Sequence, residues 1–399
     1  MPQPLPARPN LEWLKKLAKD RLAALRADNP AAKLSEAQLA VAREYGFASW
    51  RKLKAHVEQV RDTPAETLPA NSAPTSSSGE VAPDDPDLTQ LLSAIDAGDM
   101  QLVSQILERR PLLANARGPD GRTPLHAAAL CNDPYLAVLL VSAGADPELT
   151  YGDSGHTALS WAVTCNSTSF AKTLVRLGTR PDLFCAAGIG SLDDVRAFFD
   201  DAGSLRPGAS RTGSTRLAPG GGRLPCPPET AVEQISDALY IACRNAHPEV
   251  VRFLLTMQPD LAFRAYIGGT PLHWAYFGGC QPVIDLLLQA GADPTARDDT
   301  LHCTPRAFGI CVPANWGMPG VVRQRLADDP SLANLMDGRT SPLHEAARNG
   351  HAEIVRLLLD AGADPLVRDG EGKTAMDIAN VRGHALVVDA IQRFAPGPA

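Results

Sequence analysis

Apolar residues recur with helical spacing along most of the chain, in pairs of short segments separated by polar turns. In EIVRLLLDAG, at 353–362, the aliphatic residues fall on one face of a helix that ends at glycine. The segment before it, SPLHEAARNG, begins with a helix-capping serine and a first-turn proline, and then carries small alanines. The pattern predicts repeated pairs of helices joined by polar fingers.

The helix pairs return at a nearly regular spacing. With the leucine of the TPLH motif as an anchor, successive anchors are 34, 34, 24, 56, 33, 34, 37 and 33 residues apart. A glycine follows four anchors after 19 residues, which is a second marker in phase with the first. The anchors are Leu91, Leu125, Leu159, Leu183, Leu239, Leu272, Arg306, Leu343 and Met376, and the glycines are Gly144, Gly178, Gly291 and Gly362.

The segment SPLHEAARNGHAEIVRLLLDAGADPLVRDGEGKTAMDIA, at 341–379, closely resembles the ankyrin repeat, and the resemblance extends over about nine units between residues 90 and 395. It implies an all-α solenoid with short β-hairpin fingers, preceded here by a small helical module. Because each unit packs on its neighbours, the resemblance implies an extended curved surface that binds a protein partner.

Three departures interrupt the regular spacing. The unit anchored at Leu183 follows after only 24 residues, so we expect it to lack a finger. A flexible Gly/Pro/Arg/Ser-rich insertion is predicted at 203–232, which divides the repeats into a first run, 87–202, and a second run, 233–395. The unit at Arg306 has about three extra residues, and its second helix resembles that of the first unit.

The region before the repeats is helical in pattern and basic in charge. Residues 1–61 form a predicted module in which Ser35 and Ser49 cap helices, with a net charge of +5 over 11–61. It resembles a segment that precedes ankyrin arrays in bacterial proteins of unknown activity, mainly through AREYGFASWRKLKAHVE at 42–58. Residues 62–86, rich in Pro, Ser and Ala, are predicted to be a disordered linker.

Composition narrows the class of protein. The chain of 399 residues carries a net charge of −7, which does not favour nucleic acid as the main partner. No apolar run is long enough to span a membrane, and the amino-terminal residues lack the apolar core of a secretory signal. The eight scattered cysteines are expected to be reduced thiols. We therefore expect a cytoplasmic monomer that does not bind membranes.

The histidine of TPLH is the first candidate for chemistry. His126, His273 and His344 occupy one slot in three repeats, and short polar residues fill that slot elsewhere, which favours a structural tie between repeats. No motif of a metalloenzyme, nucleotide-binding loop or hydrolase is present, so no catalytic residue, metal or cofactor is expected. The small set His302, Cys303 and Cys311 has no familiar metal-ligand spacing.

Partner-binding residues are those that the resemblance places on the finger tips and on the exposed positions of the first helices. Tyr266, Ile267 and Phe277 would form the most apolar patch, which suits an interaction hot spot. The full set is Pro119, Asp120, Arg122, Leu130, Asp153, Ser154, His156, Thr164, Tyr266, Ile267, Phe277, Asp337, Arg339, Arg348, Glu371 and Lys373.

Three functions remain open from the sequence. The favoured one is a non-enzymatic scaffold or adaptor that binds a partner protein through the concave face and finger tips. A nucleic-acid-associated regulator would use the basic residues around Trp13 and Trp50. An enzyme would place its site in the irregular unit near 302–320. The basic residues in question are Lys15, Lys16, Lys19, Arg51, Lys52 and Lys54.

Overall fold

The computed structural model describes residues 33–44, 49–54, 81–210, 230–337 and 339–394, together with positions 18, 21, 22, 26 and 47. The chain divides into two compact units, residues 1–181 and 182–399. The boundary between the units falls between residues 181 and 182, after the third helix pair, whereas the sequence analysis placed a division at the insertion 203–232.

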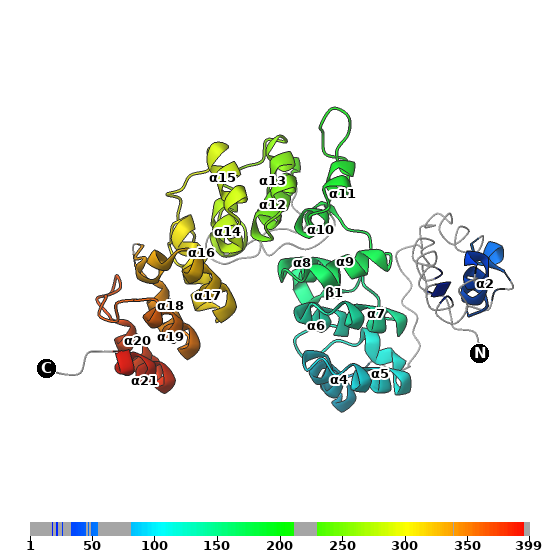
Figure 1. The fold of residues 1–399 in the computed structure, drawn as a ribbon, viewed down its shortest axis with the longest axis horizontal. Helices are drawn as coiled ribbons and strands as arrows, with labels where there is room; N and C mark the ends of the chain where they lie inside the picture. Colours follow the sequence, from blue (N-terminus) through cyan, green and yellow to red (C-terminus); the bar gives the residue numbers. More distant parts are fainter. Residues whose placement is uncertain are drawn as a thin grey trace. The chain divides into compact units, whose positions relative to one another are not determined.

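In the described residues of the first unit, α2 is followed by three pairs of helices, in which the first helix of each pair packs on the first helix of the next (Figure 1). A two-stranded antiparallel hairpin forms one finger, with Thr150 opposite Thr157. The elements are α2 (Leu34–Glu44), α4 (Pro86–Asp96), α5 (Met100–Arg109), η1 (Pro111–Asn115), α6 (Pro124–Cys131), α7 (Pro134–Ser142), β1 (Thr150–Tyr151), η2 (Gly152–Ser154), β2 (His156–Thr157), α8 (Ala158–Thr164) and α9 (Thr168–Arg176).

The part of the second unit that the structure describes has six pairs of helices stacked in the same way. We call the first helices of the pairs the inner row and the second helices the outer row. The elements are α10 (Leu183–Ile189), α11 (Leu192–Ala197), α12 (Ala231–Arg244), α13 (Pro248–Leu255), η3 (Tyr266–Gly268), α14 (Pro271–Gly278), α15 (Gln281–Gln289), α16 (Pro305–Asn315), α17 (Pro319–Asp328), η4 (Pro330–Asn334), α18 (Pro342–Arg348), α19 (Ala352–Asp360), α20 (Ala375–Arg382) and α21 (Ala385–Phe394).

Local sequence sets where these helices begin and end. Thr123 has extended backbone and caps α6, and the proline after it occupies the first helical position, where a missing N–H does no harm. At the predicted C-terminal positions, Gly144 and Gly362 have φ values of +93° and +87°. Glycine adopts this left-handed backbone without the strain that a Cβ atom would cause. The predicted phase of the repeats is therefore confirmed.

The two rows are buried to different extents. Every residue of α14 from Pro271 to Ala275 is buried, because this helix packs between α12 and α16 as well as on α15. The outer helix α15 buries Val283, Ile284 and Leu287 on one face only. Small and aliphatic side chains thus form a continuous core along the stack, and the polar turns at its edge remain free to vary.

The structure describes residues 203–210, the first quarter of the predicted insertion. Leu205 forms a bridge with Phe199, and the carbonyl of Ala209 accepts a hydrogen bond of 2.8 Å from the backbone N–H of Leu183. Residues 203–210 are thus joined to their own unit by a backbone bridge and a hydrogen bond, and the flexibility of the insertion stays a prediction. Residues 211–229 lie outside the described residues.

The resemblance between the first and seventh units extends to atomic detail. After α5, η1 places Asn115 so that its side chain donates to Gly144 O at 2.9 Å. After α17, η4 places Asn334 so that its side chain donates to Gly362 O at 2.7 Å. The PSLAN and PLLAN sequences thus form the same turn in both units.

The amino-terminal module is described only in part. α2 begins at Leu34, so Ser35 lies inside the helix and the predicted cap at this serine is wrong. The Glu36 carboxylate instead accepts from the backbone N–H of Lys33 at 3.3 Å. Ser49 does cap the following turn, since its hydroxyl accepts from Lys52 N at 3.3 Å. Most of the predicted linker at 62–86 lies outside the described residues, whereas its last residues are described and Asp85 caps α4.

Candidate partner-binding surface

The TPLH histidines join each repeat to the next. His126 is fully buried, and its Nδ1 accepts from the backbone N–H of Thr123 at 3.4 Å. Its Nε2 therefore carries the proton and donates to the carbonyl of His156 at 3.0 Å. His273 repeats this geometry, with its Nε2 at 3.1 Å from the carbonyl of Cys303.

The same role extends to His344, whose Nε2 donates to the carbonyl of Lys373 at 3.1 Å. Burial lowers the pKa of His126 and His344, and it lowers the pKa of His273 to about 4. The imidazoles are therefore neutral near pH 7 and both ring nitrogens are engaged. The structural interpretation of this slot agrees with the contacts in the structure.

The finger before α6 presents the first group of candidates. Pro119 and Asp120 are exposed at its tip, and the Asp120 carboxylate accepts from the backbone N–H of Arg122 at 3.0 Å. The Arg122 side chain pairs with the same carboxylate, which holds the turn closed. Leu130, near the end of α6, is 47% exposed. All four reach the surface of the first unit.

The next finger departs from expectation at His156, which is completely buried. Its Nδ1 lies 3.1 Å from Ser160 Oγ, so this imidazole packs within its own repeat and is not accessible to a partner. Ser154 and Thr164 are half-buried, and the Thr164 hydroxyl donates to the Ser160 carbonyl at 2.9 Å. The side chain of Asp153, at the turn, is outside the described part of the chain.

An aromatic surface lies on the second unit, where the finger before α14 approaches the end of α16. Tyr266 and Trp316 are each 36% exposed, and their ring centroids are 6.1 Å apart. Both rings pack on Trp274, which is fully buried, at 6.5 and 6.1 Å. We call Tyr266 and Trp316 the aromatic surface.

Phe277 belongs to the support of the aromatic surface. Contrary to the expectation of an exposed side chain it is 8% exposed, because Trp316 packs edge-on against it at 5.5 Å. The guanidinium of Arg244 lies 5.3 Å from the Phe277 ring centroid and 5.5 Å from that of Trp274. Such stacking holds the rings in place and supplies a cation beside them.

Trp316 is the residue that the sequence analysis missed. The unit around α16 is longer than its neighbours, and α16 has 11 residues where α14 has eight, so its end carries Trp316 to the exposed ring of Tyr266. The three extra residues were the available signal. Ile267, beside Tyr266, is half-buried with a φ of +53°, and the finger turn therefore exposes the tyrosine more than the isoleucine.

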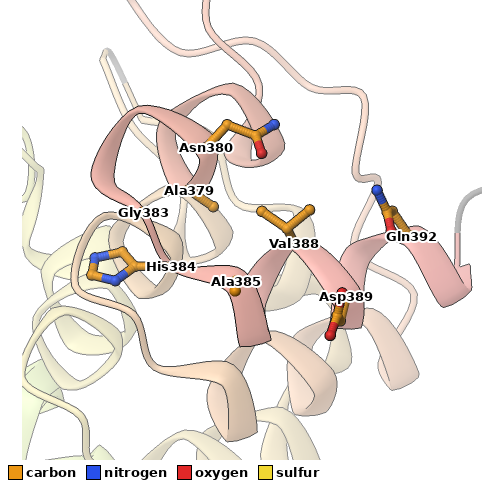
Figure 2. Close-up of a pocket in the computed structure, with 8 residues that line it drawn as sticks. All are labelled: Ala379, Asn380, Gly383, His384, Ala385, Val388, Asp389 and Gln392. Atoms are coloured by element: carbon orange, nitrogen blue, oxygen red, sulfur yellow. The ribbon is translucent and has the colours of Figure 1, made fainter.

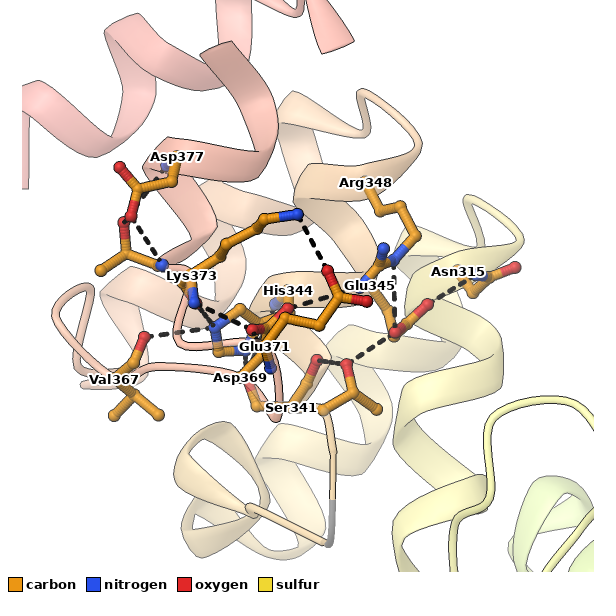
Figure 3. A network of polar contacts seen from close by, with 12 residues as sticks. Asn315, Ser341, His344, Glu345, Arg348, Val367, Asp369, Glu371, Lys373 and Asp377 are labelled. Carbon is orange, nitrogen blue, oxygen red and sulfur yellow. Dashed lines mark hydrogen bonds and ion pairs between the residues drawn. The ribbon is translucent and has the colours of Figure 1, made fainter. Parts of the chain in front are cut away.

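A polar network follows the aromatic surface along the inner row (Figure 3). Glu345 is 2% exposed, and its carboxylate accepts from Thr340 Oγ1 at 2.6 Å and from Asn315 Nδ2 at 2.7 Å. Arg348 lies 3.7 Å from this carboxylate and 3.7 Å from that of Asp369. The candidate Arg348 is thus one-third exposed and held by two acidic neighbours.

The remaining candidates lie on the last two fingers. Asp337 is largely buried, and its carboxylate accepts from the backbone N–H of Thr304 at 2.6 Å. Its role is therefore structural, because it holds the end of the finger before α16. Arg339 is exposed. Lys373 and Glu371 form an exposed ion pair of 2.8 Å at the last finger, where they can contribute to recognition rather than stability.

The irregular seventh unit does not form an open reactive site from its His/Cys set. His302 is exposed, whereas Cys303 and Cys311 are both fully buried. The neighbouring Cys303 thiol and burial raise the pKa of Cys311 well above its usual value, which keeps it a protonated, unreactive thiol. In the part of the chain that the structure describes, no three His, Cys, Asp or Glu side chains are grouped to hold a metal ion.

Two further observations concern nucleic acid and membranes. Arg51, Lys52 and Lys54 are exposed, whereas Trp13 and the other basic candidates fall outside the described residues. Among the described residues, no helix is both long and apolar enough to cross a bilayer.

The stacked helix pairs, histidine ties and finger turns define a helical repeat protein in which each unit packs on its neighbours. A sequence profile described as "Ankyrin repeats (3 copies)" matches residues 91–185 and 226–298, and one described as "Ankyrin repeats (many copies)" matches 326–379. The chain belongs to the ankyrin repeat family. Ankyrin repeats form a domain for protein–protein interaction, as the sequence resemblance implied.

Relatives of known name share only part of their length with this chain. A palmitoyltransferase, AKR1 of Lachancea kluyveri, is 28% identical over 37% of this chain and 25% of its own length. The human B-cell lymphoma 3 protein is 30% identical over 41% and 35%. A probable E3 ubiquitin-protein ligase of rice, XBOS32, is 43% identical over 35% and 34%. These relatives come from eukaryotes, so they do not support the bacterial type of ankyrin repeat protein that the amino-terminal segment suggested.

Proposed function

We propose that this protein is a non-enzymatic scaffold that binds a partner protein through the concave face and finger tips of its second unit. The observation that carries the proposal is the aromatic surface of Tyr266 and Trp316. Two large rings exposed side by side on a rigid repeat stack are the residue types that dominate binding energy at protein interfaces.

The aromatic surface is preorganised. Tyr266 and Trp316 rest on the buried Trp274, which itself packs on Phe308 at 5.1 Å between ring centroids. Rings fixed in this way lose little side-chain entropy when a partner covers them, so more of the gain from burial is retained as affinity. Arg244 supplies a positive charge beside the supporting rings of Phe277 and Trp274.

The exposed finger residues would then determine which partner fits. Arg339 stands on one finger and the Glu371–Lys373 pair on the next, so charge differs from finger to finger, whereas the histidine ties are constant. Charges at the rim mainly govern association rate and partner choice. We place the protein in the cytoplasm as a monomer, in line with the free thiols of the cysteines within the described residues.

Affinity capture with the full chain tests the proposal. Partners cross-linked to the wild-type chain are identified by mass spectrometry, and capture is repeated with a Tyr266→Ala/Trp316→Ala variant. A Tyr135→Ala variant is the matched control, because Tyr135 is 73% exposed on the outer helix α7. We expect the double variant alone to lose the specific partner while keeping the helical circular dichroism of the wild type. Equal capture by all three proteins would refute the proposal.

A further inference from the structure

The turn that carries Trp316 is only partly defined by its own helix. Pro313 lies inside α16 and has no N–H, so the backbone hydrogen bond to the carbonyl of Gly309 is missing. The carbonyl of Asn315 is among the last in α16, and an α-helix leaves its last carbonyls without an internal donor. Contacts from other elements therefore determine where the end of this helix lies, and Trp316 with it.

His351, from the following repeat, supplies one of these contacts. It immediately precedes α19, and its Nε2 donates to the carbonyl of Asn315 at 2.9 Å. A Cβ atom added to Gly317 would lie 2.6 Å from Cε1 of the imidazole, so the ring fits here only because residue 317 is glycine. The imidazole thus contacts the residue before Trp316 and the residue after it.

Glu345, on α18, holds the same turn through a side chain (Figure 3). Its carboxylate is 2% exposed and accepts from Asn315 Nδ2 at 2.7 Å. The hydroxyl of Thr340 donates to the same carboxylate at 2.6 Å, which fixes the carboxylate in place. The main chain and the side chain of Asn315 are therefore bound by two different residues of the next repeat.

Packing between rings does not by itself fix the position of Trp316. Its ring centroid lies 6.1 Å from that of Tyr266 and 5.5 Å from that of Phe277. Aromatic pairs tolerate a range of tilts and offsets, whereas a hydrogen bond weakens steeply when its atoms are misaligned. The two hydrogen bonds to Asn315 are therefore the contacts that select one position of the exposed ring.

The imidazole contact recurs at a helix end that carries no aromatic ring. His384, which immediately precedes α21 (Figure 2), donates to the carbonyl of Arg348 at 3.3 Å. A Cβ atom added to Gly350 would lie 2.8 Å from Nδ1 of this histidine. His384 thus makes the same kind of contact at the end of α18, where Asn349 occupies the position before the glycine. It provides a matched control for His351.

We propose that His351 is a positioning residue of the aromatic surface: together with Glu345 it holds Trp316 beside Tyr266 in the arrangement that a partner binds. This inference rests on the proposed function, because it assigns His351 an effect on binding that is exerted through Trp316. The imidazole does not need to touch the partner, since its Nε2 is already bonded to Asn315. The helix pair α18 and α19 thereby determines the affinity of a surface that lies on the two preceding repeats.

Fluorine NMR of the full chain labelled with 5-fluorotryptophan tests the positioning without a partner. The chain has five tryptophans, and the resonance of Trp316 is the one lost in Trp316→Phe. We expect this resonance to move or broaden in His351→Ala. It should return to the wild-type position in His351→Gln, because the glutamine amide places an N–H donor close to the position of Nε2.

The control variant His384→Ala should lower the urea midpoint to a similar extent and leave the Trp316 resonance unchanged. This comparison separates positioning from a general loss of stability, which would affect both histidine variants alike. The proposal is overturned by an unchanged resonance in His351→Ala, by an equal change in His384→Ala, or by a glutamine variant that behaves as the alanine variant does.

Dissociation constants for the captured partner test the effect on binding. His351→Ala should weaken binding about fivefold, as expected for the loss of one hydrogen bond. In a Trp316→Ala background the same change should have no further effect, because no ring remains to be positioned. Equal weakening in both backgrounds would overturn the inference, and full affinity in His351→Ala alone would overturn it without touching the proposed function. Full affinity in Trp316→Ala would overturn the proposed function and the inference with it.

Discussion

At the scale of residues, one imidazole geometry stabilises the array. Each TPLH histidine accepts from the residue that caps its own helix or from that residue's backbone, and donates to a carbonyl of the next repeat. Both contacts require the neutral tautomer with the proton on Nε2. Burial enforces that state, since it lowers the pKa of these side chains.

This geometry predicts loss of stability in mild acid. The pKa of His273 is about 4 in the folded chain against an ordinary value of 6.5. Between these values the unfolded chain binds more protons, so stability falls as pH falls from 7 toward 4. Linkage gives a loss of about 2 kcal/mol from this residue between pH 7 and pH 5. Urea unfolding of the wild type and of His273→Gln at both pH values measures it.

The variant should be less stable than the wild type at pH 7 but should show a shallower dependence on pH. Parallel pH profiles for the two proteins would contradict the assignment. The other two histidines remain in the variant, so some loss of stability in acid is still expected from it.

At the scale of elements, short turns connect one helix pair to the next. The side chain of Asn334 bridges two repeats. Its amide nitrogen donates to Gly362 O at 2.7 Å, and its amide oxygen accepts from Asp364 N at 2.8 Å. Asn115 makes the equivalent pair of bonds with Gly144 and Asp146. These bridges satisfy backbone groups that the end of an outer helix leaves open.

Asn334→Ala should therefore destabilise the second unit by about 1 kcal/mol, because two hydrogen bonds at a partly exposed site are lost. Gln324→Ala, on the exposed side of α17, is the control and should have little effect. Chemical denaturation measures both. Equal midpoints for the two variants would show that the bridge adds nothing to stability.

Much of this element structure was predictable from sequence, because caps, prolines and left-handed glycines act locally. The spacing identified the helix pairs and the TPLH histidines as ties between repeats. The prediction was wrong where contacts in the folded chain determine which side chains are buried. His156 is held in its buried position by a contact with Ser160, across the turn at the start of α8. Phe277 is buried by Trp316, which belongs to the next repeat.

At the scale of the whole molecule, the repeats separate stability from recognition. Buried ties and aliphatic stripes recur from unit to unit, while the exposed groups differ. The second unit combines an irregular inner helix, longer than the preceding α14, with two exposed rings, Tyr266 and Trp316. A regular repeat would not bring its helix end so close to the finger, and the irregularity therefore creates the proposed binding surface.

The affinity of the captured partner for single-residue variants tests this account most directly. Dissociation constants are measured by isothermal titration for the wild type, Trp316→Ala and the control Tyr135→Ala. A hot-spot residue contributes at least about 2 kcal/mol, so Trp316→Ala should weaken binding about 30-fold or more, with no change for the control. Wild-type affinity in a folded Trp316→Ala variant would contradict the central claim.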